Sequence, residues 1–363
     1  NKMNNLESRI LEYPSPLLKY KSQKARVYFN EYNLLMENTV YLPLVSGCLQ
    51  ATAQMDKEIK DNYEFMPFNY YIDSPDRIVR RYEDPAVAAF SLSMWNANLS
   101  MEVARRIKEK FPECLTVFGG PHVPFDAKEW FEKYPFVDVT VRSDGEQTFT
   151  EILKRNLKSR DFTGIDGISF RNGSGEYIKN DKENSLEKNL DVFPSPYLDG
   201  LFDDIMNSSN IKFQAIIETN RGCPFPCSFC FWGQGGLNTR YRFFSVDRVE
   251  KIANWLGLNK IEYVFCADSN FGMLKDRDPI IARIFADVKE KYGYPVKFRV
   301  CYGKNAEESI FETAKILSDA RLAIGVTLAR QSNDTKTLEI NRRKNIKIEM
   351  YNNLQKRYHD ADM

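Results

Sequence analysis

The stretch RGCPFPCSFCFWG, residues 221–233, places three of the chain's seven cysteines within eight positions. Cys223, Cys227 and Cys230 have the spacing C-x3-C-x2-C and follow the strand-like run FQAIIET. Gly222 and two prolines predict a loop through the cysteines. Three thiolates on one loop can hold three irons of a four-iron cluster and leave the fourth iron with an open coordination position.

Two alternatives compete with an iron–sulfur cluster. A structural zinc site takes four protein ligands, and neither a fourth cysteine nor a histidine lies near the three in the sequence. The other alternative is a chance group of buried or reactive thiols. The remaining cysteines are thinly spread, which in a reducing compartment favours metal ligation or buried thiols over disulfides.

Composition limits the class of protein. A chain of 363 residues with 43% apolar side chains is expected to form two domains. The 51 basic and 50 acidic residues give a net charge of +1, so nucleic acid is not expected as a partner. No apolar run is long enough to cross a bilayer, and the start NKMNNLESRI lacks a signal-peptide pattern. We therefore expect a cytoplasmic protein with no membrane partner.

The N-terminal half predicts an α/β domain over residues 39–158, preceded by an extension over residues 1–38. Apolar runs such as TVYLPLV, AVAAFSLSMW, LTVFGG and FVDVTVR alternate with helical patterns such as ATAQMDKEIKD and LSMEVARRIKEKF. Such alternation favours a Rossmann-like parallel sheet that binds its ligand at the carboxyl ends of the strands. Residues 159–210 read as a hairpin, GISFRNGSGEYI, and a linker.

The C-terminal part, residues 211–363, predicts four strand–helix units in series. The expected strands are FQAIIET, IEYVFCA, VKFRVCY and AIGVTLA, and each precedes a helical pattern. This order is typical of a (β/α) barrel with its chemistry at the strand ends. A closed barrel has eight units in about 250 residues, so we expect a partial barrel, truncated after four.

The segment CPFPCSFC resembles the motif of the radical S-adenosylmethionine (SAM) enzymes, with Phe229 at the aromatic position. The resemblance implies that the three cysteines hold a 4Fe-4S cluster. It also implies that SAM chelates the free iron and that one-electron reduction yields a 5′-deoxyadenosyl radical. Two further segments, CADSNFGM and TLARQS, fall where that family contacts SAM, although each taken alone would be interpreted as a turn or cap. The residues assigned to SAM are Phe229, Asp268, Ser269, Asn270, Arg330, Gln331 and Ser332.

The first domain has no G-x-G-x-x-G after its first strand and no G-x-x-x-x-G-K-[ST], so nothing supports a nucleotide site. Its expected strand ends are PLVSGC, SLSMWNAN, FGGPHVP and VRSDGEQTF, whose small and hydroxyl residues suit a bulky flat ligand. They resemble the cobalamin-binding domains of radical SAM enzymes. The residues assigned to cobalamin are Ser46, Gly47, Leu49, Ser91, Ser93, Trp95, Asn96, Gly119, Gly120, His122, Val123, Gly145 and Glu146.

One common cobalamin pattern, D-x-H-x-x-G, is missing from the sequence. We therefore expect no histidine on the lower face of cobalt, where an apolar residue such as Leu49, or water, would sit. His122 is expected to be a rim or turn residue.

These resemblances imply a cobalamin-dependent radical SAM methyltransferase. Through methylcobalamin and the 5′-deoxyadenosyl radical, it would methylate an unactivated carbon or phosphorus of a peptide or small natural product. The expected cofactors are a 4Fe-4S cluster, SAM and cobalamin, and the expected electron donor is a flavodoxin or ferredoxin. One alternative is a radical SAM enzyme that catalyses a rearrangement or another non-methylation reaction. Another is an iron–sulfur binding or electron-transfer module without catalysis of its own.

Overall fold

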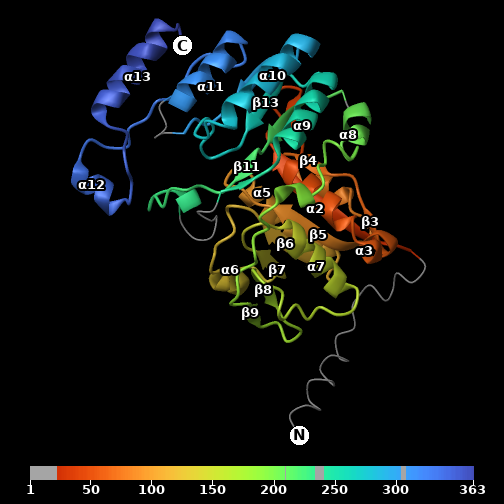
Figure 1. Ribbon diagram of the computed structural model, residues 1–363. Helices are drawn as coiled ribbons and strands as arrows, with labels where there is room; N and C mark the ends of the chain where they lie inside the picture. The colour runs from red at the N-terminus through yellow and green to blue at the C-terminus, as the bar shows by residue number, and fades with distance from the viewer. Residues whose placement is uncertain (1–22, 209, 234–240, 304–307) are drawn as a thin grey trace. The chain divides into compact units, whose positions relative to one another are not determined.

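The computed structural model describes residues 23–208, 210–233, 241–303 and 308–363. The chain divides into two compact units, whose elements Figure 1 labels. The first unit runs to Leu186 and takes in Phe193–Ile211, and the second comprises Glu187–Val192 and Lys212–Met363. No helix within the described ranges has the length and apolar character needed to cross a membrane.

The first unit is built on an eight-stranded sheet in the order β3-β1-β5-β6-β7-β8-β9, with β4 also paired to β1. Pairing is parallel from β3 to β7 and antiparallel for β8 and β9. The strands are β1 (Ala25–Asn33), β3 (Tyr63–Phe65), β4 (Asn69–Tyr71), β5 (Pro85–Ser91), β6 (Leu115–Gly119), β7 (Val139–Val141), β8 (Ile168–Arg171) and β9 (Tyr177–Lys179).

Both faces of this sheet are buried, which explains the continuous apolar runs in its strands. Val87 and Ala89 of β5 belong to one core cluster, whereas Ala88 and Phe90 belong to the other, because successive side chains point to opposite faces. Helices cover both faces, as in a Rossmann-like fold. The helices are α2 (Leu44–Ala53), α3 (Lys57–Asn62) and α7 (Glu146–Asn156) on one face, and α4 (Pro75–Arg80), α5 (Ala97–Lys110) and α6 (Lys128–Lys133) on the other.

The start of the sheet differs from the sequence prediction. Strand β1 lies within residues 1–38, which we expected to be an extension, yet it pairs with β3, β4 and β5. Its polar residues broke the apolar run that the prediction required. Asn30, for example, is buried. Its side-chain oxygen accepts hydrogen bonds from Tyr32, Asn69 and Tyr82, which compensate the loss of hydration.

The strand expected at TVYLPLV is also largely wrong. Only β2 (Thr39–Tyr41) is extended, and α2 begins at Leu44, directly after Pro43. Proline has no backbone N–H to lose and suits the start of a helix. The single helix expected over residues 51–61 is instead divided between the end of α2 and a second helix, α3. Asp56 caps α3 by accepting the N–H of Ile59 at 3.3 Å.

The hairpin predicted within residues 159–210 forms from β8 and β9, which pair antiparallel. Strand β8 also pairs antiparallel with β7. This segment therefore extends the first sheet in addition to leading toward the second unit.

The second unit contains three of the four expected strand–helix units. Strands β10 (Lys212–Ile217), β13 (Tyr263–Cys266) and β14 (Lys297–Arg299) pair in parallel, with β13 between the other two. Each is followed by a helix, and the second of these helices, α10, packs between the first, α9, and the third, α11 (Figure 1). The helices are α9 (Val246–Leu258), α10 (Asp278–Tyr292), α11 (Glu308–Asp319), α12 (Thr335–Ile340) and α13 (Ile348–Asp360).

The strand expected at AIGVTLA, residues 323–329, is not formed. Ile324 is 87% exposed, and Gly325 has a φ of +148°. Neither an uncovered isoleucine nor that backbone angle fits a buried parallel strand. The partial (β/α) architecture is otherwise as predicted.

Candidate functional site

The cysteine loop, residues 222–233, begins where a short antiparallel pair ends. Strands β11 (Asn220–Arg221) and β12 (Arg242–Phe243) pair beyond the carboxyl end of β10. Gly222 then takes a φ of +95°, a conformation that favours glycine, and turns the chain into the loop. Cys223 and Cys227 are buried, whereas Cys230 is partly exposed. The three thiols thus come from one loop at the carboxyl end of a parallel strand, where a (β/α) fold places its chemistry.

The segment after β13 holds the first cysteine. The Asn270 side-chain amide donates to the Cys223 sulfur at 3.2 Å and to the Ser269 hydroxyl oxygen at 3.0 Å. The Ser269 hydroxyl in turn donates to the Gly222 carbonyl at 2.7 Å. Two residues assigned from the sequence to the SAM site therefore lie directly against the cysteine loop.

Asp268, the third residue of that segment, is 2% exposed and binds the chain around it. Its carboxylate accepts the backbone N–H groups of Thr219 and Asn220 at 2.8 and 3.2 Å, and the Asn220 amide at 2.9 Å. Burial raises the pKa of Asp268 to about 6, and the hydrogen bonds from Thr219 and Asn220 oppose that rise. This geometry joins the ends of β10 and β13 and sets the start of the cysteine loop.

A segment far along the chain, residues 341–343, contacts the loop from another direction. The backbone N–H of Ser228 donates to the Asn341 carbonyl at 3.1 Å, and its hydroxyl donates to the Asn341 side-chain oxygen at 3.0 Å. Arg343 is buried, with one N–H directed at the Cys227 sulfur at 3.7 Å. No motif in the sequence indicates Arg343, because its contact joins positions 116 apart in the chain.

The segment with Arg330, Gln331 and Ser332 is held by local contacts. Gln331 donates its backbone N–H to the Asn345 side chain at 3.3 Å, and Asn345 donates to the Ser332 carbonyl at 2.6 Å. No hydrogen bond between described residues joins this segment to the cysteine loop. Phe229, at the aromatic position of the motif, is 56% exposed.

The donor set of the loop fits an iron–sulfur cluster. Three thiols are presented on one loop, and N–H donors already point at two of the sulfurs, which is a common environment of cluster ligands. Within the described ranges, no group of three cysteine, histidine or acidic side chains is gathered closely enough to hold a single metal ion.

In the first unit, the carboxyl ends of the parallel strands β5, β6 and β7 are neighbours in the sheet. After β5, Asn96 is buried and holds its own turn, since its side chain accepts the Ser93 N–H at 2.9 Å and donates to the Ser91 carbonyl at 3.0 Å. Trp95, between Ser93 and Asn96 in the sequence, is 56% exposed. The Trp95 indole is therefore exposed at the end of β5, whereas the Asn96 side chain is engaged by backbone groups of the turn.

The end of β6 carries two glycines with different surroundings. A Cβ on Gly119 would meet nothing within 4 Å, whereas a Cβ on Gly120 would lie 2.4 Å from the Leu92 carbonyl oxygen. His122 is exposed and donates its backbone N–H to the same carbonyl at 3.3 Å, and Val123 follows it. The β6 loop therefore crosses closely over the β5 loop and leaves open space at Gly119.

Ser46, Gly47 and Leu49 lie on α2, not at the strand end where the sequence analysis placed them. A Cβ on Gly47 would lie 2.7 Å from atoms of both Pro196 and Phe202, so glycine here serves packing. Leu49 lies 3.1 Å from the Cβ position of Gly145, the residue that precedes α7.

Glu31 contacts this region from β1. Its carboxylate accepts the Ser46 backbone N–H at 2.7 Å. Burial raises the pKa of Glu31 to about 7. Glu146, in the first turn of α7, is also buried. Glu31 therefore contacts the segment that holds Ser46, and Glu146, itself assigned to cobalamin, is a second buried acid on this face of the sheet.

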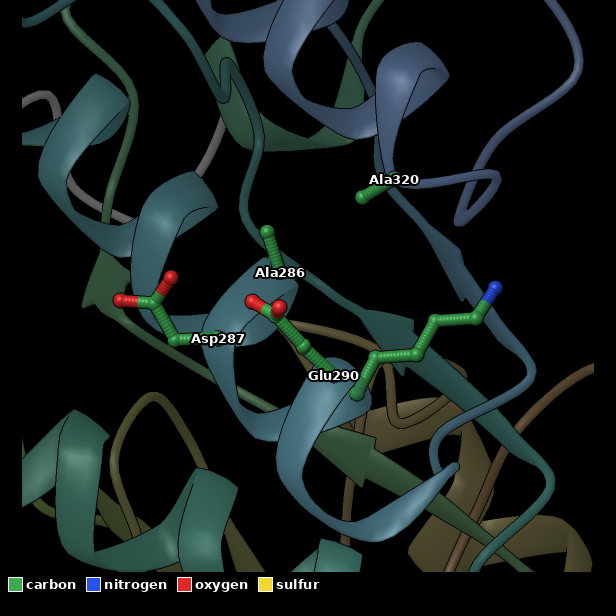
Figure 2. A pocket seen from close by; sticks show the side chains of 5 residues that line it. Ala286, Asp287, Glu290 and Ala320 are labelled. Carbon is green, nitrogen blue, oxygen red and sulfur yellow. The ribbon is translucent and has the colours of Figure 1, made fainter.

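A separate open pocket of about 370 Å³ lies on the second half of α10 and is lined by Ala286, Asp287, Lys289, Glu290 and Ala320 (Figure 2). The Lys289 ammonium donates to the Val296 and Arg321 carbonyls at 3.1 and 2.8 Å. It is therefore engaged by the backbone of two neighbouring loops. The C-terminal half of a helix in a β/α unit lies toward the amino ends of the strands, opposite the chemical edge. We therefore do not assign the functional site to this pocket.

Comparison with known proteins gives one matching family model and several similar proteins. A family model described as the B12 binding domain matches residues 60–153. The chain is 37% identical over 337 residues to the 2-(S-pantetheinyl)-carbapenam-3-carboxylate methyltransferase of Streptantibioticus cattleyicolor, covering 92% of this chain and 48% of that protein. It is also 37% identical over 344 residues to the cobalamin-dependent radical SAM methyltransferase TokK of Streptomyces tokunonensis, covering 93% and 49%. The chain thus spans about half the length of these relatives.

Solved structures share the fold. The radical SAM methyltransferase TsrM from Kitasatospora setae, with cobalamin and a [4Fe-4S] cluster bound, matches with a TM-score of 0.69 at 15% identity, covering 94% of this chain and 66% of that one. The cobalamin-dependent radical enzyme OxsB matches with a TM-score of 0.65 at 19% identity, covering 90% and 46%.

A B12-binding α/β unit followed by β/α units with a three-cysteine loop defines the class of cobalamin-binding radical SAM proteins. Residues 60–153 of this chain match the B12 binding domain, and the chain is similar to a named cobalamin-dependent radical SAM methyltransferase over more than nine-tenths of its own length.

Proposed function

We propose that this chain forms the cobalamin-binding and radical SAM portion of a methyltransferase that acts on an unactivated carbon of a small natural product. The observation that carries the proposal is the 37% identity to two named methyltransferases over more than nine-tenths of the chain. One of them is named for a carbapenam carboxylate, which favours a carbon centre over phosphorus and a small molecule over a peptide.

The cofactors follow from the same relatives. Bound together, the cluster and SAM would supply one-electron chemistry, and cobalamin would carry the methyl group. Cys223, Cys227 and Cys230 would ligate the cluster. Asn270 and Ser269 would orient the loop and bound SAM, whereas Asp268 would fix the strand ends behind them. A flavodoxin or ferredoxin would supply the electron.

Residues at the edge of the first sheet would hold cobalamin. Gly119 leaves room for close approach of a flat ligand, and the exposed Trp95 offers an aromatic surface. Leu49 on α2 would face the corrin without ligating cobalt. Asn96 and Gly120 would act through the loop backbone, because their own contacts are already made.

Iron content tests the cluster assignment. The complete protein would be reconstituted anaerobically with iron and sulfide, and is expected to hold about four irons. Each of Cys223→Ala, Cys227→Ala and Cys230→Ala removes one thiolate ligand and is expected to lose most of this iron. The control is Cys301→Ala, which changes an exposed cysteine outside the loop and should leave the iron content unchanged. Full iron in all three loop variants would contradict the assignment.

A second candidate function is a radical reaction without methyl transfer. Weaker similarity extends to a 4'-phospho-dehydrooxetanocin synthase of Priestia megaterium, 30% identical over 151 residues. SAM carrying a labelled methyl group distinguishes the two functions. Label in the product supports methyl transfer, whereas an altered product without label supports rearrangement.

A further inference from the structure

Arg343 is a buried cation with unused hydrogen-bonding capacity. It is 7% exposed, and its guanidinium lies over the Phe225 ring at 5.1 Å. Its Nε and Nη2 have no hydrogen-bond partner among the described residues. Buried polar groups are normally satisfied, so this side chain is arranged for an acceptor that binds beside it.

The described contacts of Arg343 indicate what that acceptor is. Its side chain contacts the Cys227 sulfur at 3.7 Å and the Phe225 ring, neither of which is acidic. A buried positive charge is costly unless an anion compensates it. A four-iron cluster held by three thiolates is an anion, and it would supply sulfur acceptors at this position.

The position of Arg343 is fixed by contacts that do not involve its own side chain. Two hydrogen bonds join Ser228, the residue after Cys227, to Asn341. Asn270 supplies a neutral N–H donor to Cys223 on the same loop. The cysteine loop is therefore approached by two N–H donors from separate segments, and one of these donors carries a charge.

We propose that Arg343 is a positioning residue that raises the reduction potential of the cluster through N–H···S hydrogen bonds and its fixed positive charge. The inference rests on the proposed function, because it presumes that the cluster binds. One-electron reduction by an external donor adds one negative charge to the cluster. A nearby fixed cation and hydrogen bonds to the sulfurs stabilise this added charge.

The test is a redox titration of the anaerobically loaded complete protein with dithionite and mediators, followed by electron paramagnetic resonance. The variants are Arg343→Met, Arg343→Gln and Arg343→Lys, with Arg342→Met as the matched control at an exposed neighbour. At a fixed potential, the neutral variants are expected to lower the ratio of reduced to oxidised cluster by about tenfold, a shift of about 59 mV. Arg343→Lys is expected to lower it by less, and the control not at all.

The outcomes separate this inference from the proposed function. A parent-like potential in a loaded neutral variant overturns the role of Arg343. If both neutral variants lose iron and Arg343→Lys keeps it, the potential of the loaded Arg343→Lys cluster decides: a value below that of the parent supports the role, and a parent-like value overturns it. Loss from all three variants overturns it in favour of a scaffold role. If the parent protein itself holds no iron, the proposed function fails first.

Discussion

At the residue scale, two buried ionisable side chains, Glu31 and Arg343, make contacts between separate segments of the chain. Glu31 accepts the Ser46 N–H from the first turns of α2, a helix whose N-cap residue, Pro43, makes no side-chain cap. Glu31 thus serves α2 from a neighbouring strand. The sequence predicted the cysteine motif from its local spacing, and the family resemblance assigned Asn270 to SAM although it lies 47 positions from Cys223. The sequence did not indicate Glu31 or Arg343, because neither belongs to a recognisable motif and their contacts form only in the folded chain.

The Glu31 carboxyl predicts a pH dependence of stability. Its pKa is about 7 in the folded chain, against 4.5 for an unperturbed glutamate. The folded state therefore binds more protons than the unfolded state between these values, and the free energy of unfolding falls as pH rises through that window. The contribution is at most about 3 kcal/mol, from about 1.4 kcal/mol per pKa unit.

Glu31→Gln should remove this contribution, because glutamine stays neutral and still offers an oxygen to Ser46. Urea unfolding at pH 5 and pH 8 measures the difference. The variant is expected to lose less stability than the parent between the two pH values, whereas the exposed Glu37→Gln should behave like the parent. Equal losses in the parent and Glu31→Gln would show that Glu31 does not titrate in this window.

At the element scale, the continuous apolar strands were predicted well and the mixed ones poorly. Strands β5 and β6 follow runs whose burial on both faces leaves little room for polar residues. Strands β10 and β13 follow apolar runs in which alternate residues are buried. Strand β1 was missed because it contains buried polar side chains, such as Asn30, which accepts hydrogen bonds from Tyr32 in the same strand and from Tyr82. The run AIGVTLA is apolar yet forms no strand, because composition alone does not supply a pairing partner. Register and pairing depend on contacts that a single segment does not encode.

The two glycines at the end of β6 make a matched test of this element. Gly120→Ala would place a Cβ 2.4 Å from the Leu92 carbonyl at a φ of +104°, so the β5 and β6 loops would have to separate. We expect the free energy of unfolding to fall by about 1–3 kcal/mol. Gly119→Ala meets nothing within 4 Å and should change stability little. Chemical denaturation measures both, and equal stability of the two variants would contradict the described crossing.

At the scale of the whole molecule, the chain combines two compact units. The fold class predicted from the sequence is confirmed by the parallel sheet covered on both faces, the β/α units and the family match. The chain spans about half the length of its curated relatives, so the complete reaction is a property to be measured on the complete protein.

The assignment that the rest depends on is that three thiolates hold a four-iron cluster and leave one iron open to SAM. Electron–nuclear double resonance on the reduced, loaded protein detects this open iron, with SAM carrying nitrogen-15 at the methionine amino group. We expect a nitrogen-15 coupling that appears only with the labelled cofactor and is absent from Cys230→Ala. A loaded cluster that shows no such coupling, with all four irons capped by protein side chains, would contradict it.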